Sequence, residues 1–302
     1  MVLNRQFLRS VSAADGQLAV FAVVRTSASP DALVKWTRSI VELKRSPTVL
    51  AAGRFSANPG VADVAGLELD AADLDAVRRC RPGDCLLKLT VTEMERLRRA
   101  VGDADGDWRE RTQREFRHLL VDRVHEYRAG GLVSIRPVAD GTEIQSLHEN
   151  LEAIVASTSL LRRMPVVQRW LREPAADTPI ESFVYWSKER YARGKAIITV
   201  THVGIVKSPA DEHAPPVVVI SKQILSTRYV NGALGITAIV SDEDGQSYLA
   251  YLNRSRPDLL RGVLGRMLRG TVDSFARRDA PAFVRLARKR LEGGDPPPPV
   301  DR

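Results

Sequence analysis

The segment "CRPGDC" at positions 80–85 holds the only two cysteines of the chain. Two neighbouring thiols could ligate a metal, carry out redox chemistry or form a disulfide. A structural zinc site needs two further ligands, and the five histidines lack zinc-knuckle spacing around this pair. A redox Cys-x-x-Cys motif has two intervening residues rather than four. Pro82-Gly83 suits the centre of a type II turn, which brings flanking residues within disulfide range. We predict a disulfide between Cys80 and Cys85, with two free thiols and a metal or redox pair as alternatives.

A disulfide in turn implies an oxidising compartment, so we expect a periplasmic or exported protein, with the cytoplasm as the alternative. The first residues, "MVLNRQFLRSVSAADGQ", contain no long apolar region of the kind found in signal peptides. A chain from which a signal had been removed would look the same. No stretch of 18 apolar residues predicts a transmembrane helix.

A second group of potential ligands lies in "HLLVDRVHEY", where His118, Asp122 and His125 share one face of a predicted helix. Two imidazoles and one carboxylate could bind a transition metal. A solvated helix face, on which Asp122 pairs with a neighbouring arginine, explains the same residues. We favour that interpretation and predict neither a metal nor a cofactor.

Complete catalytic motifs are missing: the chain contains no G-x-S-x-G, no H-E-x-x-H and no phosphate-binding loop. His202 could act as a general base. No partner acid or nucleophile stands out beside it, so a catalytic triad cannot be assigned. We therefore assign no catalytic residue.

The elements that must position these side chains change in character along the chain. Residues 17–27 and 48–56 are expected to form strands, with a helix beginning after Ser29 between them. A mostly helical block follows from 63 to 175. Five runs rich in Val, Ile, Thr and Tyr come next, at 180–191, 195–207, 216–229, 233–241 and 247–254. Their short connections favour an antiparallel meander. A long C-terminal helix is predicted to start at Ser255, with Pro257 in its first turn.

This order of elements resembles the helix-grip fold of the START-like, or polyketide-cyclase-like, superfamily. The resemblance covers roughly 15–60 and 178–292, and rests on element order alone. It implies an α+β fold in which a curved antiparallel sheet wraps around the C-terminal helix. We expect one domain over 1–292, with 63–175 as a helical insertion, and a disordered Pro-rich tail at 293–302. The Cys–turn–Cys and the "YWSKE" segment are also similar to uncharacterised bacterial exported proteins.

Members of this superfamily bind lipids, sterols, hormones or polyketides, and some are enzymes, but they share no universal catalytic residues. The resemblance therefore implies an apolar cavity between the sheet and the last helix. Both faces of the strands at 195–207 and 216–229 mix apolar with single polar residues. Such strands fit a sheet with helices on one side and a ligand cavity on the other, and also a packed core without a cavity.

If the cavity exists, polar and aromatic side chains of the meander are best placed to orient a ligand. These candidates are Tyr185, Trp186, His202, Gln223, Tyr229, Tyr251 and Arg254. An ordinary role in the core or at the rim is the alternative for each of them.

The positive charge of the chain gathers near its C-terminus. Eleven of the basic residues but only four acidic ones lie in 254–292, which accounts for nearly all of the net charge of +8. The predicted helix there could cover the sheet with a solvated basic face, dock on an anionic membrane, or bind nucleic acid. Nucleic acid is the least favoured partner, because few aromatic residues are available for stacking on bases.

Together these observations predict a protein that binds a hydrophobic small molecule or lipid in an internal cavity. We expect a carrier or transport protein, without chemical conversion, rather than an enzyme. The alternatives are an enzyme of the same fold, such as a cyclase or hydrolase using His202, and a nucleic-acid or membrane interaction module using the basic helix.

Overall fold

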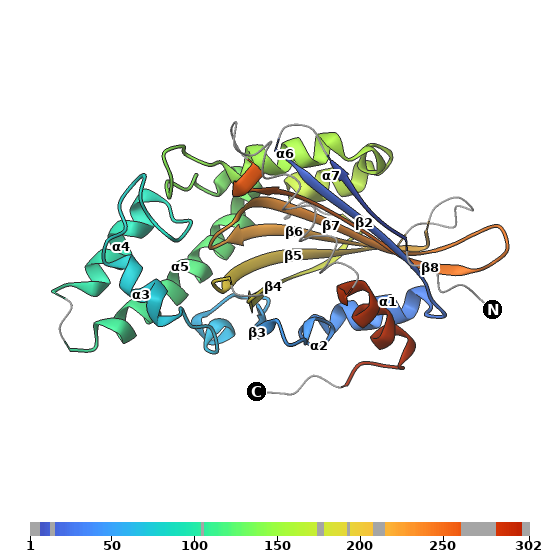
Figure 1. Ribbon diagram of the computed structural model, residues 1–302, viewed down its shortest axis with the longest axis horizontal. Helices are drawn as coiled ribbons and strands as arrows, with labels where there is room; N and C mark the ends of the chain where they lie inside the picture. The colour runs from blue at the N-terminus through green and yellow to red at the C-terminus, as the bar shows by residue number, and fades with distance from the viewer. Residues whose placement is uncertain are drawn as a thin grey trace.

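An eight-stranded antiparallel sheet forms the centre of the protein in a computed structural model (Figure 1). The structure describes residues 7–12, 16–103, 106–173, 178–191, 194–207, 215–260 and 282–297. The strand order is β1-β2-β8-β7-β6-β5-β4-β3. The strands are β1 (Phe7–Ser12), β2 (Leu18–Arg25), β3 (Val49–Arg54), β4 (Glu181–Glu189), β5 (Ile197–Lys207), β6 (Val217–Ser226), β7 (Val230–Ser241) and β8 (Ser247–Pro257).

The five strands β4 to β8 form the meander that the sequence predicts, each pairing with the next. The early strands extend this meander at both edges, since β2 pairs with β8 and β3 pairs with β4. One boundary differs from the prediction: Ser255 and Pro257 lie within β8 and do not begin a helix. The reason is pairing, because Ser255 faces Ala233 and Pro257 faces Val230 on the long strand β7.

One face of the sheet is covered by α1 (Pro30–Arg38), α2 (Ile40–Lys44) and a helix over 282–292, the last drawn in dark red in Figure 1. Ser29 caps α1 by accepting a hydrogen bond from the backbone of Ala32 at 3.1 Å. The chain after the C-terminal helix is fastened to α1, where Trp36 Nε1 donates to the Gly294 carbonyl at 2.8 Å. The earlier part of the predicted basic helix, 261–281, lies outside the described residues.

The opposite face of the sheet carries the helical block between β3 and β4 (Figure 1). Its α-helices are α3 (Ala71–Val77), α4 (Val91–Val101), α5 (Trp108–Gly130), α6 (Leu147–Ser157) and α7 (Pro165–Arg172). The block also contains the short 3₁₀ turns η1 (Val61–Val64), η2 (Gly131–Ser134) and η3 (Ser159–Arg163), and a fourth turn, η4 (Asp258–Leu260), follows β8. None of the described helices is long and apolar enough to cross a membrane.

Alternation along the strands gives the sheet a different core on each face. On β4, Phe183 and Tyr185 pack toward α1, whereas Val184 and Trp186 pack toward the helical block. Trp170 of α7 comes especially close to the sheet at Gly204, where a Cβ atom would lie 2.9 Å from its ring. A glycine therefore lets this ring lie directly against β5.

The disulfide predicted from "CRPGDC" is confirmed, with Cys80 bonded to Cys85. The backbone N–H of Asp84 donates to the Arg81 carbonyl at 2.9 Å, and Gly83 has a φ of 84°. These are the features of a type II turn, whose third residue needs positive φ. The turn also holds the loop after α5, because the N–H of Gly83 donates to the Ala139 carbonyl at 2.8 Å.

Candidate functional site

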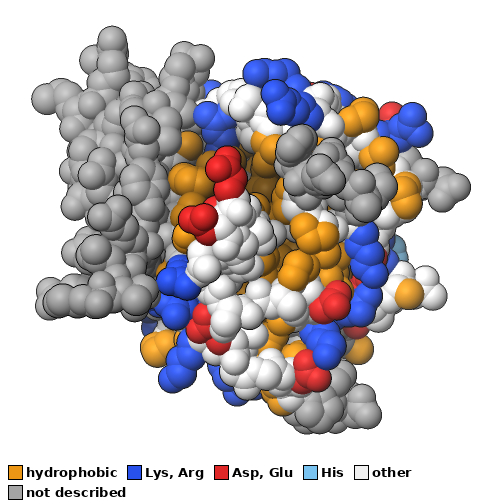
Figure 2. All heavy atoms as spheres, turned by 90° about the vertical axis from the view of Figure 1, so that its right-hand side faces the viewer, with side chains coloured by type: hydrophobic (Ala, Val, Ile, Leu, Met, Phe, Trp, Pro, Cys, Tyr) orange, Lys and Arg blue, Asp and Glu red, His pale blue; other side chains and the backbone are white. Residues whose placement is uncertain are grey.

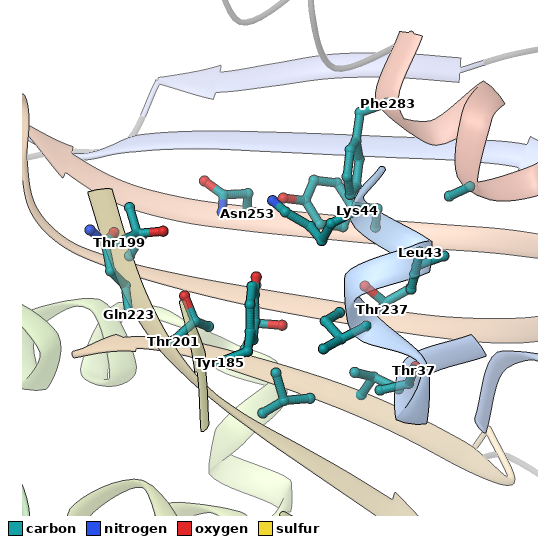
Figure 3. Close-up of a pocket in the computed structure, with 18 of the residues that line it drawn as sticks. Thr37, Leu43, Lys44, Tyr185, Thr199, Thr201, Gln223, Thr237, Asn253 and Phe283 are labelled. Atoms are coloured by element: carbon teal, nitrogen blue, oxygen red, sulfur yellow. The ribbon is translucent and has the colours of Figure 1, made fainter. Parts of the chain in front are cut away.

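A cavity of about 310 Å³ lies between the sheet and the helices α1, α2 and 282–292 (Figure 3). The helices supply an apolar wall made of Leu33, Ile40, Leu43, Phe283, Val284, Ala287 and Leu291. The strands supply a floor with many polar side chains, including Thr199, Thr201, Ser221, Gln223, Ser226, Thr237 and Asn253. On the side of the molecule shown in Figure 2, hydrophobic side chains gather in a hollow that charged side chains border.

The polar floor follows from strand register. Tyr185 on β4 pairs with Thr201 on β5, and Thr201 pairs with Gln223 on β6. These residues are direct cross-strand neighbours and therefore share one face of the sheet. On the other side of the floor, Thr237 on β7 pairs with Tyr251 on β8. Hydroxyl and amide groups thus lie on five consecutive strands beneath the apolar wall.

A charged group stands at one end of the cavity, where α2 meets β4. Lys44 Nζ lies 2.7 Å from Glu189 Oε1, and both side chains are largely buried. Ser187 Oγ donates to the same carboxylate oxygen at 2.7 Å, and the Tyr191 hydroxyl donates to the other oxygen. The Lys44 ammonium also lies 5.9 Å from the centre of the Phe283 ring. One carboxylate therefore accepts from three donors beside the cavity.

Burial disfavours the charged forms of Lys44 and Glu189, but the groups next to each of them stabilise those charged forms. The pKa of Glu189 is lowered despite burial, because the Lys44 ammonium stabilises the carboxylate. The Glu189 carboxylate helps to raise the pKa of Lys44 well above its usual value in spite of burial. Burial and the charge of Glu189 raise the pKa of Tyr191, and burial raises that of Tyr251 to about 12. At neutral pH the site thus holds an ion pair and neutral tyrosine hydroxyls.

The structure brings three of the seven predicted ligand residues to the cavity, namely Tyr185, Gln223 and Tyr251. It places Trp186 and His202 on the opposite face, because each follows a cavity-facing residue on its strand. Trp186 Nε1 donates to the Asp63 carbonyl at 2.8 Å.

Tyr229 and Arg254 do not line the cavity either. Tyr229 lies between β6 and β7 with a φ of 66°, and its side chain is exposed. Arg254 follows the cavity residue Asn253 on β8 and so points to the other face. There its Nη1 donates to Ser157 Oγ at 2.6 Å.

His202, the general base considered above, is part of the core between the sheet and the helical block. Its Nδ1 lies 2.7 Å from the Tyr127 hydroxyl, and its ring packs on Trp170. Lys222 lies in the same core and donates to the Leu171 carbonyl at 2.5 Å. Burial lowers the pKa of His202 well below its usual value and that of Lys222 to about 7. The placement of His202 does not support the enzyme alternative that would use it.

Two of the three potential ligands on α5, Asp122 and His125, have protein partners. Asp122 accepts a hydrogen bond from Arg96 Nη1 at 2.8 Å, as expected for the solvated helix face. His125 Nε2 donates to the Pro59 carbonyl at 2.9 Å. No group of three or more His, Cys, Asp or Glu side chains among the described residues is placed to hold a metal ion.

Sequence reasoning missed the charged end of the cavity. Glu189 lies four residues after Tyr185 on one strand, so alternation could have placed both on the same face. Lys44 gave no such signal, because it ends a short helix whose contact with β4 is set by the tertiary fold.

Comparisons with known proteins address the fold. No protein-family model and no curated protein matches the chain. Several solved structures are similar to parts of it, and three of them are described here. TTHA0849 from Thermus thermophilus has a TM-score of 0.28 and 10% identity, covering 44% of this chain and 86% of its own. The Zhui aromatase/cyclase from Streptomyces sp. R1128 has a TM-score of 0.27 and 14% identity, and the match covers 37% of this chain and 67% of the cyclase. The di-domain ARO/CYC StfQ of the steffimycin biosynthetic pathway has a TM-score of 0.27 and 17% identity, and the match covers 44% of this chain and 45% of StfQ.

The fold is the helix-grip fold. The α+β architecture that element order predicted is confirmed by the structure itself, in which an antiparallel sheet packs one face against the C-terminal helix. The similarities to solved structures, at these identities and TM-scores, carry no further argument about this chain.

The prediction that the protein is not an enzyme needs correction. It follows from this fold in the sequence analysis, and two of the solved structures described above are named as aromatase/cyclases. The fold therefore gives no reason to prefer binding without conversion, and that prediction is wrong.

Proposed function

We propose that the protein binds a small, largely hydrophobic molecule with oxygen substituents in the cavity beneath α1 and α2. The division of the lining supports this proposal: the helices present apolar side chains and the strands present hydroxyl and amide groups. Ligand sites commonly combine an apolar lining with a few convergent polar groups that fix orientation.

The size of the cavity favours a compact ligand. Its volume of about 310 Å³ is at the lower end of the range for small-molecule sites. A flat ring system would pack against the apolar wall and present the oxygens at its edge to the polar groups of the floor. We therefore favour a fused-ring compound over a membrane lipid with long chains.

A second candidate function is chemical conversion of the bound molecule. Tyr185 projects its hydroxyl toward the cavity, and the Lys44 ammonium lies at the same site (Figure 3). A tyrosine proton donor near a buried cation can stabilise negative charge that develops on a carbonyl oxygen. Two structural neighbours are named as aromatase/cyclases, and a ring-forming reaction fits these cavity groups better than chemistry at His202 does.

A cavity-blocking substitution tests the binding function. Ala287 lines the cavity, whereas Ala282 in the same helix is exposed. We expect Ala287→Phe to weaken 2-naphthol binding by at least about tenfold in calorimetry, because the ring fills the space that the ligand needs. Ala282→Phe serves as the control and should bind like the wild type. Equal binding by both variants, or no binding of 2-naphthol and related phenols by the wild type, would contradict the proposal.

Export remains our proposal for localisation, and the bond between Cys80 and Cys85 supports it. Thiol titration of the protein from its native source, in denaturant without reductant, should find no free thiol. Two free thiols would contradict the proposal that the protein is exported.

A further inference from the structure

The ion pair at the end of the cavity is unequal in its hydrogen bonding. Glu189 accepts from Lys44, Ser187 and Tyr191. The ammonium of Lys44 has three N–H donors, and Glu189 is its one ion-pair partner among the described residues. The carboxylate is thus surrounded by donors, while the ammonium keeps donors that a ligand could use.

The groups around Lys44 increase the electrostatic attraction between its ammonium and an anionic ligand. The ammonium extends from α2 into the cavity toward the end where Asn253 of β8 lies, and the Tyr185 hydroxyl rises from the floor nearby (Figure 3). Phe283 lies over the ammonium and also packs against Tyr251, with ring centres 5.4 Å apart. Aromatic walls lower the local dielectric, so a charge here interacts more strongly than it would in water.

We propose that this end of the cavity is a subsite for an acidic oxygen of the ligand, either a carboxylate or an ionised phenol or enol. Lys44 provides the positive charge, and Asn253 and Tyr185 provide neutral donors beside it. The inference rests on the proposed function and deepens it, because it names the chemical group that the cavity selects. A cationic ligand would instead meet the ammonium at close range.

A matched pair of probes tests the subsite. 2-Naphthoate carries the acidic oxygen, and 2-naphthamide has nearly the same shape without the charge. We expect wild-type protein to bind 2-naphthoate at least about tenfold more tightly than 2-naphthamide in calorimetry.

Substitutions of the two charged residues should act in opposite directions. Glu189→Gln removes the competing negative charge and should tighten 2-naphthoate binding several-fold. Lys44→Met should weaken it by at least about tenfold, and in each variant the affinity for 2-naphthoate should change several-fold more than the affinity for 2-naphthamide. An ion pair that only fastens α2 to β4 predicts instead that both substitutions weaken both probes.

Two further variants keep the test decisive. Lys44→Met leaves Glu189 unpaired, so the neutral double variant Lys44→Met/Glu189→Gln is measured as well and should bind both probes alike. Lys35→Met is the control, because Lys35 on α1 makes an exposed ion pair with Asp295 and its substitution removes the same charge.

The outcomes separate the two proposals. Equal binding of both probes by wild-type protein would overturn the subsite and leave the cavity as a binding site. Failure of both probes to bind would overturn the proposed function and the subsite together.

Discussion

Single side chains on the cavity floor determine what the ligand can present. Tyr185 is buried next to the cavity and faces it across from Thr201, with which it pairs in register. Its hydroxyl is therefore available to a ligand oxygen. A hydrogen bond between this hydroxyl and the ligand contributes only about 0.5–1.5 kcal/mol to the binding free energy, because both groups form hydrogen bonds with water before binding.

Tyr185→Phe should consequently weaken 2-naphthol binding about three- to tenfold, while naphthalene binding stays the same. The fold should tolerate the change, since the ring is retained. Calorimetry with the two probes measures the difference. Tyr248→Phe is the control, because the Tyr248 hydroxyl donates to Asp242 on the exposed surface. A parallel loss for naphthalene would show that Tyr185 acts through packing alone.

Lys222 makes a pH-dependent contribution on the opposite face of the sheet. Burial lowers its folded-state pKa to about 7, whereas the unfolded chain has the ordinary value near 10.5. Between these values the unfolded state binds more protons, so the free energy of unfolding rises with pH. The slope for one proton is at most about 1.4 kcal/mol per pH unit.

Urea unfolding at pH 7, 8 and 9 should therefore show increasing stability, and Lys222→Met should remove most of that slope. Lys195→Met, an exposed substitution with the same charge change, should keep it. The window avoids tyrosine ionisation, which begins at higher pH. A wild-type curve that is flat or falls from pH 7 to 9 would contradict this account of Lys222.

At the scale of the elements, strand periodicity predicted more than helix placement. Alternation correctly separates Tyr185 from Trp186 and Thr201 from His202, but it does not say which set faces a cavity. That choice depends on which helices cover each face, and helix docking is a long-range property. For this reason the predicted ligand residues were divided between the two faces, and Lys44 was missed.

The turn at 80–85 was predictable because its signal is local. Pro82-Gly83 specifies a type II turn, and this turn brings the flanking cysteines close enough to form a disulfide.

Gly83→Ala should lower the free energy of unfolding by about 1–2 kcal/mol in urea, since alanine disfavours the left-handed conformation. Gly66→Ala, at a glycine without positive φ and with no atom close to the added Cβ, should be nearly neutral. Equal effects at the two positions would argue against the turn.

Across the whole molecule, the sheet separates a stabilising core from a binding cavity. The helical block packs on one face through side chains such as Trp170, which is 1% exposed and contacts His202. The other face meets α1, α2 and the helix over 282–292 around the cavity. Stability and ligand binding should therefore respond to different substitutions.

Trp170→Ala should lower the free energy of unfolding by about 3–5 kcal/mol, because it leaves a large void in a closed core. The affinity for 2-naphthol should stay within about twofold wherever the variant is folded, since the ring lies on the face away from the cavity. Phe283→Ala should do the opposite: its ring is 41% exposed, so stability changes little, but the cavity loses part of its apolar wall. Unfolding and calorimetry on the two variants measure both quantities. If Trp170→Ala weakened binding as much as Phe283→Ala does, the two faces would be coupled through the strands and this division of roles would fail.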